Sequence, residues 1–201
     1  MSIIFYTLLI AYFVGSISFK GILLWLSPPK LFPNQLNKTF SLITPKAKLI
    51  DALSDILKGI IGAHTVYSMT DSELLVSIWG IGLILGNTWP IFSKFKERFN
   101  LLGFLGVLFY INTLFTIIYI LIGIAIFILL NHPELSLVIS STILPFIIMT
   151  FQWLGISPTY IILGIFLAIF IPLKLRNKFP IILEPKKNDL FERFKNKNLS
   201  T

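Results

Sequence analysis

Long apolar stretches alternate with short polar segments along almost the whole chain. Four of the stretches contain no Asp, Glu, Lys or Arg, and they cover residues 1–19, 74–93, 99–130 and 135–173. A run of about 18 or more such residues is long enough to cross a bilayer as a helix. The pattern therefore predicts an all-α, polytopic membrane protein.

Two of these stretches are longer than a single membrane span requires. At about 1.5 Å of rise per residue, residues 101–130 are expected to break at 110–113. Residues 135–173 are expected to break at 152–158, where Gly, Ser and Pro cluster. With these breaks the chain has about seven helical segments, one of them short. The remaining spans are expected over residues 2–26, 49–68 and 74–92.

The basic residues give the expected orientation of these helices. Fifteen of the seventeen Lys and Arg residues fall in three short clusters, at residues 30–48, 94–98 and 174–197. Short cytoplasmic loops collect Lys and Arg, so all three clusters are expected on the cytoplasmic side. The N-terminus is then outside and the C-terminus inside, and the charges expected outside are Asp71 and Glu73.

Composition narrows the classes of function. The net charge of +8 follows from the basic loops, and no soluble module is left to bind nucleic acid. The absence of cysteine excludes disulfides, thiol nucleophiles and cysteine metal sites, and the spacing of the two histidines suggests no metal site. We expect one integral domain over residues 1–201 in the cell (inner) membrane, with a basic cytoplasmic tail at 174–201.

Some polar residues lie inside the predicted spans. Asp51, Asp55 and Lys58 are spaced to share one helix face, where Asp55 can pair with Lys58. Ionisable groups within a span are costly and often functional, so the pair is either structural or part of a site. In the first span, Gly15 and Ser16 suit close helix packing, and the hydroxyl can also donate a hydrogen bond.

Several motifs, taken in order along the chain, resemble one family: the acyl-phosphate-dependent glycerol-3-phosphate acyltransferases of bacterial membranes. Their order, spacing and topology carry the resemblance, which covers most of the chain. The matching segments are the Gly-Ser-Ile that ends residues 9–17, the Asp-x-x-Lys-Gly at 55–59, the Gly-Asn-Thr-Trp-Pro-Ile-Phe at 86–92 with Lys-Phe-Lys at 94–96, the Leu-Pro-Phe at 144–146 and the Glu-Pro-Lys at 184–186.

The resemblance implies a cytoplasm-facing site that transfers a fatty acyl group from acyl-phosphate to glycerol 3-phosphate, giving lysophosphatidic acid. It implies these two substrates and the lipid bilayer as partners, and no cofactor: no metal, coenzyme A or acyl carrier protein acts directly. Lys and Arg suit the two phosphates. No catalytic residue is assigned. The substrate-binding residues expected on this basis are Ser16, Asn34, Asn37, Asp55, Lys58, Asn87, Lys94, Lys96 and Asn177.

The chain departs from the family pattern in its loops. Residues 27–44 contain no glycine where the family has a glycine-rich run, and residues 96–100 read Lys-Glu-Arg-Phe-Asn where the family has Lys-Gly-Gly-Lys-Gly. The family's histidine after Gly86 is Asn87 here. Side chains in place of glycine make close backbone approach to a phosphate costly.

Three hypotheses therefore stay open. The first is a divergent acyltransferase of this family. The second is a catalytically degenerate paralogue that binds lipid or a protein partner. The third is an unrelated small transporter, which would use the charged residues of the second span, at 51, 55 and 58.

Overall fold

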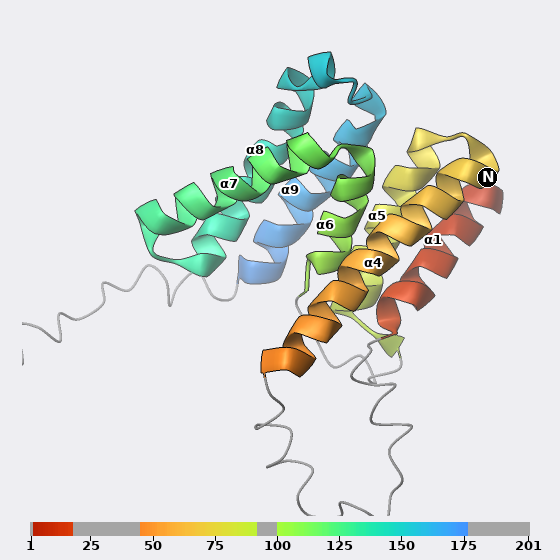
Figure 1. Cartoon of the computed structure of the whole chain (residues 1–201), viewed down its shortest axis with the longest axis horizontal. Helices are drawn as coiled ribbons and strands as arrows, with labels where there is room; N and C mark the ends of the chain where they lie inside the picture. The colour runs from red at the N-terminus through yellow and green to blue at the C-terminus, as the bar shows by residue number, and fades with distance from the viewer. Residues whose placement is uncertain (1, 18–44, 92–99, 177–201) are drawn as a thin grey trace, which may run out of the picture.

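The computed structural model describes residues 2–17, 45–91 and 100–176 (Figure 1). Within these ranges the chain is helical and contains no strand, which confirms the all-α class with seven helical segments, one of them short. Which ends face the cytoplasm stays a prediction. The α-helices are α1 (Ser2–Ser16), α4 (Pro45–Thr70), α5 (Glu73–Thr88), α6 (Leu102–Ile111), α7 (Thr113–Leu130), α8 (Pro133–Thr150) and α9 (Ile161–Leu175).

The break between α6 and α7 lies at Asn112, inside the segment predicted for it. This residue has extended backbone angles (φ −164°, ψ 117°). Its side-chain oxygen accepts a hydrogen bond from the Phe115 backbone N–H at 3.0 Å. Asparagine is favoured at this capping position because it satisfies a free N–H of the first helical turn. A polar residue thus begins α7 within a stretch that carries no charge.

The break between α8 and α9 is also where the sequence predicts it. It contains two short 3-10 helices, η2 (Gln152–Leu154) and η3 (Pro158–Tyr160). Gly155 follows η2 with a φ of 79°, a left-handed conformation that glycine adopts without steric cost. The Ser157 hydroxyl then accepts a hydrogen bond from the Thr159 N–H at 3.3 Å.

Several helix ends differ from the expected ones. Helix α4 begins at Pro45 instead of residue 49, because proline fits the first turn of a helix, where its missing N–H is not needed. Helix α5 ends at Thr88 instead of residue 92, because Pro90 follows and the residue before a proline avoids the helical region. The predicted continuation of the first span to residue 26 lies outside the described residues.

The helices pack as close neighbours: α1 lies against α5, α4 against α6, and α8 against α9 (Figure 1). Glycines allow the closest approaches. A Cβ added to Gly86 would lie 2.1 Å from the Tyr12 carbonyl oxygen, and one added to Gly106 would lie 2.1 Å from the Ile56 carbonyl oxygen. Small residues let membrane helices meet backbone to backbone in this way.

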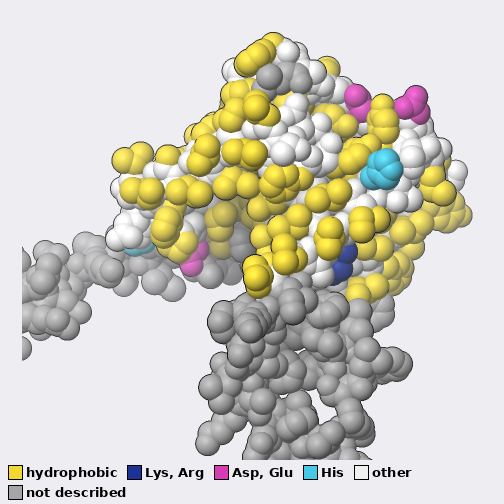
Figure 2. Space-filling view, in the orientation of Figure 1, with side chains coloured by type: hydrophobic (Ala, Val, Ile, Leu, Met, Phe, Trp, Pro, Cys, Tyr) yellow, Lys and Arg dark blue, Asp and Glu magenta, His cyan; other side chains and the backbone are white. Residues whose placement is uncertain are grey.

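The surface suits a bilayer. Three helical segments of the described part are long and apolar enough to cross a membrane: Thr113–Leu130, Pro133–Thr150 and Pro158–Leu175. Large apolar side chains point outward, and Leu129 on α7 is 82% exposed. On the face drawn in Figure 2, hydrophobic side chains are spread over the described residues, and the few charged ones lie near its edges. Lipid would cover this apolar area, which is too extensive for a water-soluble monomer.

Candidate functional site

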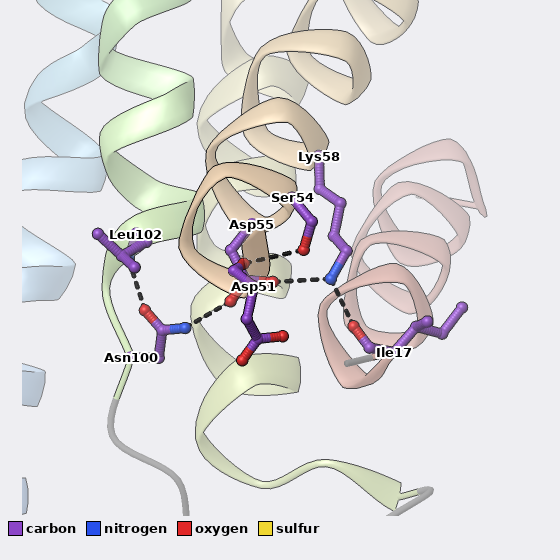
Figure 3. A network of polar contacts seen from close by, with 7 residues as sticks. All are labelled: Ile17, Asp51, Ser54, Asp55, Lys58, Asn100 and Leu102. Atoms are coloured by element: carbon purple, nitrogen blue, oxygen red, sulfur yellow. Dashed lines mark hydrogen bonds and ion pairs between the residues drawn. The ribbon is translucent and has the colours of Figure 1, made fainter. Parts of the chain in front are cut away.

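An ion pair within α4 is at the centre of the polar contacts. The Lys58 Nζ lies 2.7 Å from Asp55 Oδ1 (Figure 3). The two residues are three apart, so they lie on one face of the helix, and the pairing expected from the sequence is confirmed. Asp55 is only 1% exposed. A buried carboxylate needs such partners to offset its loss of hydration.

Lys58 also connects α4 to α1. Its Nζ donates a second hydrogen bond, at 2.5 Å, to the carbonyl oxygen of Ile17 (Figure 3). Ile17 directly follows the last residue of α1, and carbonyl groups at a helix end have no partner within the helix. The ammonium therefore satisfies a group at the end of α1 while it neutralises Asp55.

Asn100 connects the same carboxylate to α6. Its Nδ2 donates to Asp55 Oδ2 at 2.5 Å, and its Oδ1 accepts from the Leu102 N–H at 2.9 Å (Figure 3). Sequence reasoning missed Asn100 as a site residue. The available signal was an asparagine just before a predicted helix, a pattern typical of helix starts, but its bond to Asp55 depends on how the helices pack.

Asn87 lies beside this network. It is on the last turn of α5 and is 6% exposed. A Cβ added to Gly103, in the first turn of α6, would lie 2.9 Å from Asn87 Nδ2 and 3.6 Å from the Asp55 backbone oxygen. Asn87 is thus a buried polar group close to both α4 and α6.

Ser16, the last residue of α1, packs against α5. It is 1% exposed, and its hydroxyl donates to the Tyr12 carbonyl oxygen at 2.8 Å. A Cβ on Gly86 would lie 2.9 Å from the Ser16 backbone nitrogen, so Ser16 packs next to the residue that precedes Asn87. Its hydroxyl proton is already used, which leaves the oxygen as an acceptor.

Trp89 connects a fifth helix, α9, to this end of the bundle. The Tyr12 hydroxyl donates to the Trp89 carbonyl oxygen at 2.8 Å. The Lys174 Nζ lies 4.7 Å from the centre of the indole ring, a distance typical of cation–π contacts. Phe170 packs edge-on against the same ring, with 5.6 Å between ring centres. Lys174 belongs to the last turn of α9, and the sequence did not single it out as a site residue.

The described members of the predicted substrate-binding set therefore lie at one end of the bundle. This end consists of the C-terminal ends of α1, α5 and α9 and the N-terminal parts of α4 and α6, whereas Asp71 and Glu73 lie at the opposite end of α4 and α5. No group of three or more metal-binding side chains occurs in the part of the chain that the structure describes. The members placed here are Ser16, Asp55, Lys58 and Asn87; those outside the described residues are Asn34, Asn37, Lys94, Lys96 and Asn177.

The chain is similar to known membrane enzymes along nearly its whole length. The family model described as glycerol-3-phosphate acyltransferase matches residues 36–184. The glycerol-3-phosphate acyltransferase of Francisella tularensis subsp. holarctica (strain OSU18) is 22% identical over 200 residues, which cover 96% of each chain. That of Francisella tularensis subsp. novicida (strain U112) is 23% identical over 200 residues, again with 96% of each chain covered.

Two crystal structures share the fold. Both are of PlsY, described as an integral membrane glycerol 3-phosphate acyltransferase. The form with glycerol 3-phosphate has a TM-score of 0.64 at 21% identity and covers 95% of this chain and 98% of its own. The form with lysophosphatidic acid has a TM-score of 0.65 at 22% identity and covers 90% and 91%. At this identity the likeness establishes the arrangement of the helices.

Proposed function

This chain belongs to the glycerol-3-phosphate acyltransferase family, and we propose that it transfers a fatty acyl group from acyl-phosphate to glycerol 3-phosphate, forming lysophosphatidic acid. The extent of the match carries the proposal. The family model spans residues 36–184, and the Francisella relatives align over 96% of both chains. Because the chain belongs to this family, the hypothesis of an unrelated small transporter is dropped.

The proposed reaction is a simple acyl transfer. The 1-hydroxyl of glycerol 3-phosphate attacks the carbonyl carbon of the acyl-phosphate. The bond from that carbon to the phosphate oxygen breaks, inorganic phosphate leaves, and the hydroxyl proton passes to it. Both substrates carry a phosphate, and charge-assisted hydrogen bonds from Lys and Arg are the strong contacts that such groups accept.

We propose that the site lies at the end of the bundle that contains Asn87 and Asn100, facing the cytoplasm. Lys94 and Lys96 occur in the sequence between these two residues, and both asparagines lie at this end. Asn87 is 6% exposed and its amide lies close to the first turn of α6, so this amide suits a substrate oxygen. Asp55 bonds to Lys58 and Asn100 instead.

The proposal is tested in membranes from a strain that lacks its own glycerol-3-phosphate acyltransferase. We expect membranes that contain this chain to convert labelled glycerol 3-phosphate and acyl-phosphate into labelled lysophosphatidic acid. Membranes from the same strain with an empty vector give the background, and acyl-coenzyme A in place of acyl-phosphate tests the donor. The proposal is wrong if no labelled lipid forms above background at any level of expressed protein.

A second candidate function is supported by the loop sequences. Residues 27–44 contain no glycine, so a backbone cradle for phosphate is harder to form there. A degenerate paralogue would bind the substrates or lipid without turnover. Purified protein that binds labelled glycerol 3-phosphate but forms no product, although it is folded, would favour this function over transfer.

The proposed orientation gives a separate prediction. The chain has no cysteine, so single cysteines can be introduced and labelled. We expect Ser72→Cys, between α4 and α5, to react with a membrane-impermeant maleimide in intact cells. We expect Ser200→Cys, in the basic tail, to react only after the cells are permeabilised, because positive segments stay in the cytoplasm. The reverse pattern would show that the orientation is wrong.

A further inference from the structure

We propose that Asp55 is a positioning residue for the transfer reaction, which holds the end of α1 and the start of α6 in place through Lys58 and Asn100. This inference rests on the proposed function, but it assigns Asp55 and Lys58 a different role from the one expected from the sequence. Asp55 orients the site through Lys58 and Asn100 and does not contact the substrate.

The bonds of the carboxylate are the first argument. Each oxygen of Asp55 already accepts a hydrogen bond: Oδ1 from Lys58 at 2.7 Å and Oδ2 from Asn100 at 2.5 Å. The residue is 1% exposed, and a carboxylate only accepts hydrogen bonds, as the oxygens of an ionised phosphate do. A buried, doubly bonded anion is therefore suited to orienting its neighbours and is a poor ligand for either substrate.

The groups that the network holds are the second argument. Lys58 bonds to the Ile17 carbonyl at 2.5 Å, and Asn100 bonds to the Leu102 N–H at 2.9 Å. Residues 18–44 continue from Ile17 and residues 92–99 lead into Asn100, and these two segments contain four of the nine predicted substrate-binding residues. One carboxylate thus fixes the attachment points of both segments.

The direction of the hydrogen bonds makes the network testable. Asn100 offers its oxygen to Leu102 and its NH₂ group to Asp55. In Asp55→Asn an amide NH₂ would face that NH₂ group, and turning the Asn100 amide would lose the bond from Leu102. In Asn100→Asp two carboxylates would face each other. The double variant Asp55→Asn/Asn100→Asp restores the three hydrogen bonds described above, with donor and acceptor exchanged between residues 55 and 100.

The first experiment measures kcat and KM for glycerol 3-phosphate in the two single variants and the double variant, per mole of folded protein. We expect each single variant to lower kcat/KM by about 10- to 100-fold, since a displacement of about 1 Å can cost this much. The double variant is expected to recover most of the loss. Asp71→Asn, at the other end of α4, is the matched control and should leave kcat/KM unchanged.

The second experiment separates this inference from the proposed function because it needs no turnover. Spin labels attached to Ile17→Cys and Leu102→Cys leave the backbone carbonyl of residue 17 and the backbone N–H of residue 102 in place. The distance between the two labels reports how rigidly the network holds these positions. We expect a narrow distance distribution, a broad one with Asp55→Asn, and a narrow one again with the double variant. If the distribution is unchanged by Asp55→Asn, or if the double variant recovers neither the distances nor kcat/KM, Asp55 is not a positioning residue.

Discussion

Replacing Gly106 with alanine is expected to separate α4 from α6 and to lower the free energy of unfolding by about 3 kcal/mol, at the upper end of the usual cost of overpacking. The added Cβ would lie 2.1 Å from the Ile56 carbonyl oxygen and 2.9 Å from the Gly59 Cα. Both are backbone atoms, so the clash cannot be relieved by turning a side chain. The change is measured by unfolding purified protein in mixed micelles with increasing SDS.

Gly123→Ala is the matched control for this prediction. Gly123 lies in α7, and a Cβ added there meets nothing within 4 Å. Alanine favours a helix over glycine by about 1 kcal/mol, so this variant is expected to unfold at the same SDS concentration or a higher one. Equal losses from the two substitutions would contradict the close approach of α4 and α6.

Lys58→Met is expected to lower the free energy of unfolding by about 3 kcal/mol, the lower end of the cost of removing one member of a buried ion pair, because the Lys58 side chain is 19% exposed and that of Asp55 is 1% exposed. Methionine has a similar length but no charge, so it removes the ammonium bonded to Asp55 Oδ1 and to the Ile17 carbonyl. Asp55 is 1% exposed, and water cannot readily replace the lost donor. The same SDS titration measures the effect.

The double variant Asp55→Asn/Lys58→Met distinguishes an unpaired charge from a lost contact. With both charges removed, the buried site no longer contains an anion that needs a cation, so we expect the double variant to be more stable than Lys58→Met alone. If both variants lose the same stability, the cost of Lys58→Met does not come from the Asp55 charge.

The features that depend on nearby residues could be predicted from the sequence. The helices are separated where polar or glycine residues interrupt the apolar stretches, as at Asn112 and Gly155. The pair of Asp55 and Lys58 follows from their spacing within one helix. The helix ends were predicted less accurately. Helix α4 begins at Pro45, and α5 ends before Pro90, so both helices start or stop earlier than hydrophobicity alone suggests.

The features that depend on how helices meet could not be predicted. The contact of Lys174 with Trp89 joins residues 85 positions apart in sequence, and the bond of Asn100 to Asp55 joins residues 45 positions apart. Neither pair has a local spacing that reveals it. The bond of Asn100 to Asp55 forms where Gly59 and Gly106 let the backbones of α4 and α6 approach closely, and this approach is set by the packing of the helices.

Purified protein in lipid nanodiscs gives the most direct test of acyl transfer by this chain. The protein is supplied with acyl-phosphate and labelled glycerol 3-phosphate, and released inorganic phosphate and labelled lysophosphatidic acid are measured in the same samples. We expect the two products to appear in equal amounts and only when both substrates are present. Folded protein that releases phosphate without labelled lipid, or that forms neither product, would contradict transfer.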